Sequence, residues 1–490
     1  MDGRLAVVIL AAGRSTRFKS RTSKLLHELC GKPVIEWVLD AVAPLDPVQV
    51  ILIYGTHSAA LAARFAEGYR GRSLDLVLQD PPLGTGHALL QAEPVLRSEI
   101  THVLVLPGDV PQVRAVELLT LRAAHSQAGS PHAVLTATLA DPSGYGRVLR
   151  DRSHPERVLR IVEHLEATPQ ELAIQEINSG IYVFDRSVFA QVRRAAEEFG
   201  AENVKGEYYL PDVVRLAPTV AVCAEEPLEV LGVNDREQLA QAEAALQARL
   251  RSHWMREGVT FRLPETIYLH HDVELAADVE IGPHCVLTNG TRIGTGTQLI
   301  QGCYLEGCEI GANCVLLHVR GTEAVLHDGV RAGPYVNLRP GTILREDVKV
   351  GNFVETKKAD VGRGSKLPHL QYIGDATLGE NVNIGAGTIF CNYDGYTKHH
   401  TTLGDNVFIG SNSSLSAPLT IGDDAYVAMA SAITKDVPAG ALAIGRARQE
   451  NKLGYVKLLR EKILRRNKRR EDAAKGGAES TADALQDEEA

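Results

Sequence analysis

The first half of the chain alternates short apolar runs with stretches of helical periodicity. LAVVIL (5–10), VQVILIY (48–54) and HVLVLPGD (102–109) are rich in aliphatic residues, and PVIEWVLDAV (33–42) has a helical pattern. Alternation of this kind is typical of βαβ units, so we expect an α/β domain with a Rossmann-like, mostly parallel sheet. Later apolar runs predict further strands for a substrate-side subdomain, at 133–139, 146–151, 160–164 and 179–185.

A single long helix is predicted where this alternation ends. It runs from Asp235, whose side chain can cap it, to about His253. Its apolar residues recur at helical spacing on one face, at Leu239, Ala242, Leu246 and Leu250. The spacing predicts a helix that connects two structural units.

After about residue 265 a six-residue period replaces the helical one. Aliphatic residues followed by glycine recur at intervals that mostly lie on, or one residue off, a multiple of six, at Ile281, Ile293, Ile310, Val350, Val361, Ile373, Leu378, Ile384, Leu403, Ile409 and Ile421. A chain that turns every six residues, with one aliphatic side chain per turn facing inward, forms a triangular parallel β-helix. We expect roughly nine or ten coils of three hexads, in a left-handed parallel β-helix of hexapeptide repeats.

Off-register intervals predict loops, and one of them is the 19-residue interval from Ile384 to Leu403, which contains CNYDGYTKHH (391–400). Surplus residues have no place inside a coil, so residues 392–400 are predicted to project from the prism as a loop.

Length and composition agree with several globular domains. The chain has 490 residues, of which 44% are hydrophobic and 23% charged, and single cores stop growing at roughly 250–300 residues. The net charge of −9 gives no footprint for nucleic acid over the whole chain, and the basic run at 457–470 is interpreted as a solvated helix before a disordered tail.

No apolar stretch reaches the roughly 18 residues that a membrane span requires, and the first apolar run is interpreted as a strand rather than a signal peptide. Seven cysteines without CxxC spacing predict reduced thiols in a cytoplasmic protein. We expect Cys285, Cys303, Cys308 and Cys314 to fill a core as small apolar residues.

The turn after the first strand is the first candidate site. In LAAGRSTRFKSRTSK (10–24) a glycine turn lets backbone N–H groups approach phosphates, and Arg17 and Lys24 add cations. Neither GxxxxGK[ST] nor GxGxxG is present, so a P-loop enzyme and a dinucleotide dehydrogenase are not supported. Taken alone, the segment is as compatible with an ordinary turn and solvated charges.

Polar residues near the ends of other strands strengthen this site. They are Gln79, Gly84, Thr85, Asp109, Gly146, Glu163, Asn178 and Asn234. Carboxylate and amide oxygens suit Mg²⁺, which takes few protein ligands and prefers phosphates for the rest.

On these motifs the first half resembles the sugar-1-phosphate nucleotidyltransferases. From about residue 5 to about 450 the chain resembles the GlmU family, which combines N-acetylglucosamine-1-phosphate uridyltransferase and glucosamine-1-phosphate acetyltransferase. The resemblance implies a uridyl site in which UTP is bound by Leu10, Ala11, Ala12, Gly13 and Gln79, with Gly84 and Thr85 nearby, and in which Arg17 and Lys24 face the triphosphate. It implies that N-acetylglucosamine-1-phosphate is bound by Gly146, Glu163 and Asn178, and that Pro107 and Gly108 lie beside the substrates. It implies that Mg²⁺ is held by Asp109 and Asn234.

Polar residues also interrupt the hexads, where a coil does not need them for stability. Arg339, Lys357, Tyr372 and Asn383 could make a pocket for an anionic sugar, and His369 could take up a proton at neutral pH. A lone histidine is usually structural, so its neighbourhood carries this hypothesis.

The resemblance implies that His369 is the general base that deprotonates the amine of glucosamine-1-phosphate, and that Arg339, Lys357, Tyr372 and Asn383 hold the sugar phosphate. It implies an acetyl-CoA site made by Ala386, Asn392, Tyr393, Ser411, Met429 and Arg446. It further implies a homotrimer that shares this site between chains.

The sequence departs from the family pattern at four positions. Ser15 and Ala430 stand where the family usually has glycine, Ser23 where it usually has proline, and Met429 where it more often has alanine. These changes leave the charged groups in place but put the backbone near the phosphates, and the coenzyme position, in doubt.

The resemblance thus implies a uridyltransferase domain (1–233), a linker with a long helix (234–264), a β-helix acetyltransferase domain (265–450) and a C-terminal helix with a disordered tail (451–490). The product, UDP-N-acetylglucosamine, would feed bacterial cell-wall synthesis. Two alternatives stay open: a monofunctional sugar-1-phosphate nucleotidyltransferase with a structural β-helix, and a non-catalytic scaffold.

Overall fold

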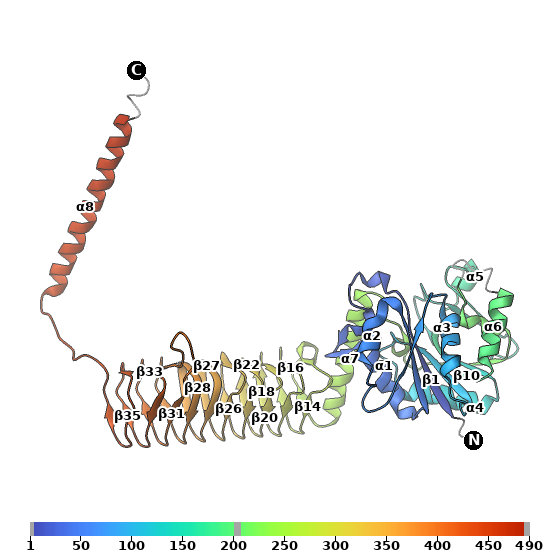
Figure 1. Cartoon of the computed structure of the whole chain (residues 1–490), viewed down its shortest axis with the longest axis horizontal. Coiled ribbons are helices and arrows are strands. Elements are labelled where there is room, and N and C mark those ends of the chain that lie inside the picture. Colours follow the sequence, from blue (N-terminus) through green and yellow to red (C-terminus); the bar gives the residue numbers. More distant parts are fainter. Residues whose placement is uncertain (1–3, 200–206, 485–490) are drawn as a thin grey trace.

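The computed structural model describes residues 4–199 and 207–484. A globular α/β domain stands at one end of a long prism of short strands, and a C-terminal helix projects from the other end of the prism (Figure 1). None of the helices in the described part of the chain has the length and apolar character needed to cross a membrane.

The globular domain is built on a nine-stranded sheet with the central order β11-β7-β10-β6-β1-β4-β5, in which β8 pairs with β10 and β9 pairs with β8. Its strands are β1 (Leu5–Ala11), β4 (Gln49–Gly55), β5 (Asp75–Gln79), β6 (His102–Pro107), β7 (His132–Thr138), β8 (Arg147–Arg150), β9 (Val158–Val162), β10 (Glu176–Asp185) and β11 (Thr219–Cys223). β1 runs parallel to β4 and β6, whereas β10 runs antiparallel to β6 and β7. The expected α/β domain is therefore confirmed. Its sheet is mixed rather than mostly parallel, because β8, β9 and β10 add antiparallel pairings, and β11 adds a strand that the sequence pattern did not reveal.

Helices cover both faces of this sheet (Figure 1). They are α1 (Val34–Val42), α2 (Ala59–Arg64), α3 (Thr85–Ala92), α4 (Ala115–Ala128), α5 (Pro169–Leu172) and α6 (Val188–Phe199). Successive side chains of a strand point to opposite faces, and β1 shows this directly: Leu5, Val7 and Ile9 belong to one buried core while Ala6 and Val8 belong to the other. Burial on both faces explains the unbroken apolar run of β1.

Strand direction decides where the polar residues meet. β1, β4 and β6 are parallel, so the residues that follow their carboxyl ends lie along one edge of the sheet. The antiparallel β10 brings its first residues, including Asn178, to the same edge and carries Asp185 to the opposite one, beside His102.

The long helix α7 (Arg236–Arg256) joins the domain to the prism. As predicted, the Asp235 side chain caps it, by accepting from the backbone N–H of Gln238. Glu243 accepts from the Cys30 N–H and the Tyr268 hydroxyl. The buried Gln247 amide bonds both the N–H and the C=O of Leu269. These contacts fix the first coil of the prism against the globular domain.

The prism is a 26-stranded sheet in which each strand pairs mainly with the third strand after it. Its strands are β12 (Thr260–Phe261), β13 (Tyr268–Leu269), β14 (Glu274–Leu275), β15 (Glu280–Ile281), β16 (Val286–Thr288), β17 (Arg292–Ile293), β18 (Gln298–Gln301), β19 (Tyr304–Glu306), β20 (Glu309–Ile310), β21 (Val315–Leu317), β22 (Val319–Thr322), β23 (Val325–Leu326), β24 (Arg331–Ala332), β25 (Val336–Leu338), β26 (Ile343–Leu344), β27 (Lys349–Val361), β28 (Lys366–Leu378), β29 (Asn383–Ile384), β30 (Ile389–Cys391), β31 (Thr401–Leu403), β32 (Phe408–Ile409), β33 (Ser414–Ser416), β34 (Leu419–Ile421), β35 (Tyr426–Val427), β36 (Ala432–Ile433) and β37 (Leu442–Ala443). The expected parallel β-helix with three strands per coil is confirmed.

Stacked aliphatic side chains fill the prism. Ile281 lies in register with Leu299, and Leu299 with Leu316, so one coil takes 17 or 18 residues. All three are fully buried in one continuous core. Cys285, Cys303, Cys308 and Cys314 are buried free thiols in that core, as predicted.

The interrupted hexad gives the expected projection. Ala376 of β28 pairs with Thr401 of β31, 25 positions later, and the surplus residues leave the coil between β30 and β31. Tyr396 in this loop is 93% exposed.

The last helix, α8 (Tyr455–Ala484), extends beyond the basic run that the sequence analysis expected to be helical. It covers most of the segment expected to be disordered, a difference that fits the good helix-forming alanine, glutamate and lysine residues there. Residues 485–490 of the predicted tail lie outside the described part of the chain.

Candidate active sites

A cleft of about 650 Å³ opens at the carboxyl edge of the sheet. Most of the residues that the sequence analysis assigned to the uridyl site line it: Leu10, Ala11, Ala12, Gly13, Lys24, Gln79, Gly84, Thr85, Pro107, Asp109, Glu163 and Asn178. Gly108, Gly146 and Asn234 lie behind this lining and contact it through Leu10, Asn178 and Lys24. Segments far apart in the sequence therefore meet in one cavity.

The turn after β1 leaves the strand through Gly13 and enters a short 3-10 helix (Thr16–Phe18) that carries Arg17. A Cβ at Gly13 would meet nothing within 4 Å, so the backbone there is open to a ligand. Arg17 is exposed, and its charge acts on Tyr145 together with that of Asp109. Arg17 is therefore near the cleft without lining it.

Lys24 lies at the centre of a small polar cluster. Its ammonium group forms an ion pair with Asp109 Oδ2 and donates to Asn234 Oδ1 at 3.2 Å. The Lys24 and Asp109 side chains are only 12% and 18% exposed. A carboxylate oxygen and an amide oxygen thus converge on one cation, and hard oxygen ligands of this kind fit Mg²⁺.

A second turn, before α3, closes the cleft on another side. Gln79, which is 3% exposed, donates to the Gly84 carbonyl at 3.0 Å. Gly84 has φ +99°, and a Cβ there would lie 2.7 Å from the Tyr208 carbonyl oxygen, so glycine is required. The Thr85 hydroxyl accepts from the Leu210 N–H at 3.1 Å. Gln79 and Thr85 therefore hold the turn in shape in addition to facing the cleft.

The other wall is formed by β10 and the turn before β8. Asn178 Oδ1 accepts from the Tyr182 hydroxyl at 2.8 Å and from the Gly180 N–H at 3.0 Å. Its backbone N–H donates to the Gly146 carbonyl at 2.9 Å. With its oxygen occupied, Asn178 keeps the amide NH₂ for a ligand.

The cleft also contains residues that the sequence analysis did not select: Arg14, Thr16, Leu25, Pro82, Ala88, Gly180, Tyr182, Glu207, Leu210 and Pro211. Tyr182 is fully buried, and this burial raises the pKa of its hydroxyl, which stays protonated to orient Asn178. Its position in an apolar strand makes it indistinguishable from a core residue in the sequence. The only hint in the sequence was the glycine at position 180. In the structure it has φ +79° and lies where the pairing of β10 with β7 is irregular.

The prism presents three outer faces, each defined by a column of residues in register. Face A carries Lys349, Lys366, Asn383, Phe408 and Tyr426. Face B carries Asn337, Glu355, Tyr372, Ile389 and Ser414. Face C carries Ile343, Asp360, Thr377, Thr402 and Thr420.

His369 lies at the corner between faces A and B. Its carbonyl accepts from the Gly387 N–H, next to Ala386, and the Ala386 carbonyl accepts from the Asn412 N–H, next to Ser411. The Ser411 carbonyl accepts from the Ala430 N–H, next to Met429. Four predicted residues therefore form a ladder along one corner. The His369 ring is exposed and makes no hydrogen bond to any residue that the structure describes.

Arg446 extends this ladder beyond the last regular coil. Its neighbour Gly445 donates to Ser431 Oγ and its carbonyl accepts from the Ala432 N–H. Met429, which replaces the smaller family residue, is 60% exposed, so its longer side chain meets no steric obstacle in this chain.

Several cationic side chains lie close together at the end of face B. Arg339 forms an ion pair with Glu355 at 2.9 Å. Lys398, from the projecting loop, lies within hydrogen-bond reach of Lys357 and lowers the pKa of that lysine, with Arg339 adding to the effect. Ammonium groups held this close repel each other, and an anion between them would relieve the repulsion. Lys398 was not among the residues predicted for this site, although the projection of its loop was predicted.

The loop itself is ordered by short-range hydrogen bonds. Asn392 donates to Asp375 Oδ2 at 2.5 Å and approaches the Tyr372 hydroxyl at 3.4 Å. Asp394 accepts from His399 and from the N–H groups of Thr397 and Tyr396, and these contacts lower its pKa. Asn392 therefore joins the loop to face B, while Tyr393 is 58% exposed.

Asn383 does not join this group. It lies on face A, whereas Tyr372 lies on face B and Arg339 and Lys357 lie at the end of face B. Within one chain the structure therefore divides the predicted acetyl-transfer residues between two faces.

Three of the four departures from the family pattern fall at special backbone positions. Ser15 and Ala430 have φ 52° and 57°, in the left-handed region that favours glycine. Ser23 has φ −54° and ψ 138°, values that proline adopts, and its buried hydroxyl has no partner among the described residues. The backbone thus keeps the shape that glycine and proline would specify, at some cost in strain.

Comparison with known proteins covers nearly the whole chain. Residues 7–211 match the family model of the MobA-like NTP transferase domain, and residues 400–435 match the hexapeptide repeat of succinyl-transferase. The bifunctional protein GlmU of Pelobacter propionicus is 43% identical over 458 residues, 92% of this chain and 98% of the relative. Those of Listeria innocua and Heliobacterium modesticaldum are each 44% identical, over 94% and 92% of this chain and 99% and 97% of theirs.

The strained alanine generates a stability prediction. Ala430→Gly should raise the free energy of unfolding by about 1 kcal/mol, because glycine adopts φ 57° without the Cβ clash. Urea unfolding followed by circular dichroism measures the change. The neighbouring Ala428→Gly, at a position without positive φ, should lower stability by about 0.5–1 kcal/mol. Equal effects of the two substitutions would show that Ala430 is not strained.

Proposed function

This chain belongs to the GlmU family, and from that membership we propose which of its residues carry each of the two reactions. It is a bifunctional uridyltransferase and acetyltransferase that makes UDP-N-acetylglucosamine, a precursor of peptidoglycan. The observation that carries the residue assignments is the presence of two separate polar constellations, one in the cleft and one at the corner and face of the prism.

In the cleft we assign uridylyl transfer. A phosphate oxygen of N-acetylglucosamine-1-phosphate is already an anion, so it attacks the α-phosphorus of UTP without a protein base. The new P–O bond forms as the bond to the pyrophosphate leaving group breaks. Lys24 and Arg17 balance the charge of the phosphates, and the N–H groups of the Leu10–Gly13 turn approach the nucleotide.

Asp109 and Asn234 would hold Mg²⁺ in this site. Their oxygens converge on the Lys24 ammonium group, and the two oxygen ligands leave further coordination positions for phosphates and water. When bound, Mg²⁺ supplies charge neutralisation of the phosphates and the leaving group.

Asn178, oriented by Tyr182, would bind the sugar together with Glu163 and the Gly146 backbone. Gln79, Gly84, Thr85, Pro107 and Gly108 would complete the pocket. The Gln79–Gly84 hydrogen bond supports this assignment because it fixes the turn that faces the nucleotide.

At the prism we assign acetyl transfer. His369 would take a proton from the amine of glucosamine-1-phosphate, so that the nitrogen attacks the thioester carbon of acetyl-CoA and the coenzyme thiolate leaves. An exposed imidazole without an intramolecular partner is available for this role. Arg339, Lys357 and Lys398 would bind the phosphate, beside Tyr372.

The corner ladder of Ala386, Ser411, Met429 and Arg446, with Asn392 and Tyr393 from the loop, would line the acetyl-CoA site. A ladder of exposed residues along one edge suits a long, extended coenzyme.

We also propose a homotrimer and a cytoplasmic location, both on family grounds. The division of Asn383 and Tyr372 between two faces supports a trimer, because faces of neighbouring prisms that pack together would reunite them. The exposed apolar residues of the C-terminal segment, such as Leu453 and Leu464 at 96% and 67%, also support contacts with another copy.

The two assignments can be separated by single substitutions. His369→Ala should reduce coenzyme-thiol release from acetyl-CoA by about 10²–10⁴-fold and still form pyrophosphate from supplied N-acetylglucosamine-1-phosphate. Asp109→Ala should do the reverse, with at least about a hundredfold loss of pyrophosphate formation. His154→Ala and Asp272→Ala, at exposed positions without positive φ, serve as matched controls and should keep both activities. Loss of both activities in either active-site variant would contradict the two-site assignment.

Lys398 gives a more specific test of the phosphate site. Lys398→Ala should raise KM for glucosamine-1-phosphate by about tenfold or more, because it removes one of three cations that face the phosphate. Uridylyl transfer should not change. Lys435→Ala removes an exposed lysine of the same prism and should leave KM unchanged. An unchanged KM in Lys398→Ala would remove this residue from the site.

A further inference from the structure

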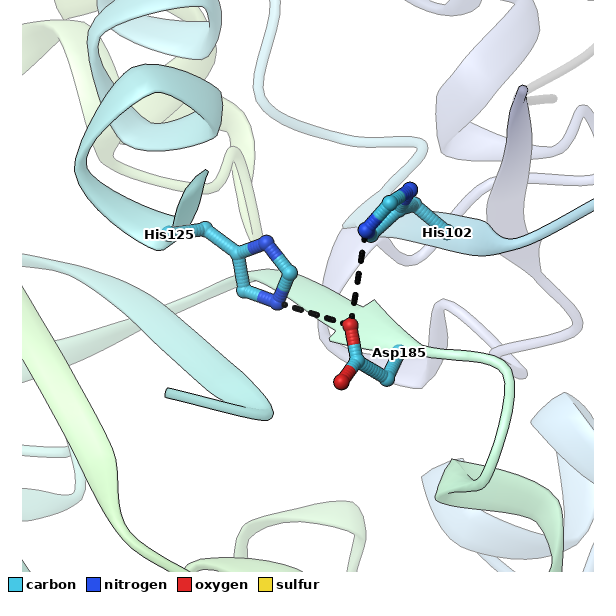
Figure 2. Close-up of side chains that lie close together, drawn as sticks. All are labelled: His102, His125 and Asp185. Atoms are coloured by element: carbon cyan, nitrogen blue, oxygen red, sulfur yellow. Dashed lines mark ion pairs between the residues drawn. The ribbon is translucent and has the colours of Figure 1, made fainter. Parts of the chain in front are cut away.

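Two histidines and an aspartate meet at the edge of the sheet opposite the nucleotide cleft. His102 is the first residue of β6, His125 lies in the last turn of α4, and Asp185 is the last residue of β10. Their potential ligand atoms all lie within 4.8 Å of one another. Figure 2 shows the three side chains turned toward a common point.

The distances do not match hydrogen bonds. His102 Nε2 and His125 Nε2 lie 3.5 and 3.4 Å from the same oxygen, Asp185 Oδ1. Hydrogen bonds between nitrogen and oxygen are usually 2.7–3.2 Å long. These two separations match the edge of a tetrahedron around Zn²⁺, which is about 3.3–3.4 Å for metal–ligand bonds of about 2.0–2.1 Å, and the third, between the two histidines, is within 4.8 Å.

His125 lacks the partners that a buried imidazole needs. Its side chain is 4% exposed, and neither ring nitrogen makes a hydrogen bond of normal geometry to the described residues. A neutral imidazole with a free lone pair is the form that binds a metal ion.

The neighbouring residue Thr101 contacts the His102 ring on the side away from Asp185. The ring Nδ1 lies 2.9 Å from the Thr101 hydroxyl, whose oxygen also approaches the Arg4 carbonyl at 3.4 Å. If the hydroxyl donates to Arg4 and accepts from Nδ1–H, the Nε2 lone pair faces the Asp185 carboxylate. A lone pair and a carboxylate oxygen that face each other repel, and a cation between them would remove this repulsion. Metal-bound histidines usually donate a hydrogen bond from their other ring nitrogen, as Nδ1 of His102 does in this arrangement.

No side-chain cation from the described neighbouring residues fills that place. Arg186 follows Asp185, but its guanidinium donates to the carbonyls of Arg97, Ser98 and Ile100. His132, the other histidine nearby, bonds Thr219 and Gln191 with its two nitrogens.

We propose that His102, His125 and Asp185 form a binding site for a divalent transition-metal ion, with Zn²⁺ as the expected occupant. Two imidazoles and one carboxylate are ligands of Zn²⁺, whereas Mg²⁺ prefers oxygen ligands throughout. Asp185 and His102 are 45% and 29% exposed, so a fourth position faces solvent and takes water. The site is separate from the Asp109 site, which lies at the other end of β6, roughly 20 Å along the strand.

A metal ion bound at this site would hold together three elements that are distant in the sequence. It joins the start of β6, the end of α4 and the end of β10, and the metal binds the folded arrangement only. Binding to the folded state alone raises the unfolding temperature.

The test uses tag-free, full-length protein stripped with a chelator and held in excess Mg²⁺. Titration with Co²⁺ should produce the intense visible absorption of a tetrahedral site at one ion per chain, and Zn²⁺ should abolish it. Zn²⁺ should also raise the unfolding temperature. Absence of the Co²⁺ band and of any Zn²⁺-dependent thermal shift would overturn the proposal.

Variants locate the site. His102→Gln and Asp185→Asn, which preserve side-chain size, should weaken Co²⁺ binding at least tenfold, and Thr101→Val should weaken it about 10–100-fold through His102. His154→Gln removes an exposed histidine of the same domain and should bind Co²⁺ like the wild type. Unfolding temperatures of the chelated variants check that each is folded. Equal binding by His102→Gln, Asp185→Asn and wild type would place the metal elsewhere and contradict the proposal.

Discussion

Parallel strand register is the constraint on which both halves of this molecule depend. In the globular domain it brings the carboxyl ends of β1, β4 and β6 to one edge, where the residues that follow them form the cleft. In the prism it returns the chain to the same lateral position every 17 or 18 residues, so that buried aliphatic residues stack. Residues that do not fit the stack are forced outward, and those outward positions carry the polar groups of the proposed second site.

Unfavourable charge arrangements then set the proposed functional positions apart from the structural ones. Lys24 is held by Asp109 and Asn234 with little exposure to solvent, and Lys357 lies beside Lys398, whose charge outweighs that of the nearby Asp375 in its effect on the pKa of Lys357. Neither arrangement improves a fold by itself, since burial and like charge both carry a cost. In the proposed sites, phosphates or a metal ion would offset these costs.

The architecture could be predicted from the sequence because each spacing of apolar residues along the chain corresponds to one kind of regular structure. The alternating runs, the capped helix after Asp235 and the hexads all correspond to elements in the structure, and the 25-residue step from Ala376 to Thr401 is the predicted loop. Contacts that depend on three-dimensional proximity left no such pattern. In the sequence alone, Tyr182 is indistinguishable from a core residue and Lys398 from a solvated charge. Nothing in the sequence links His102, His125 and Asp185 to one another. Asn383 could not be assigned to a face before the register was known.

If the cleft and the prism are independent reaction centres, N-acetylglucosamine-1-phosphate made at the prism of one molecule can react in the cleft of another. Mixing the His369→Ala and Asp109→Ala proteins with glucosamine-1-phosphate, acetyl-CoA, UTP and magnesium tests this most directly, with UDP-N-acetylglucosamine measured by chromatography. The account predicts that neither protein alone makes the product at an appreciable rate and that the mixture does. A mixture as inactive as its components, although each retains its own partial reaction, would contradict it.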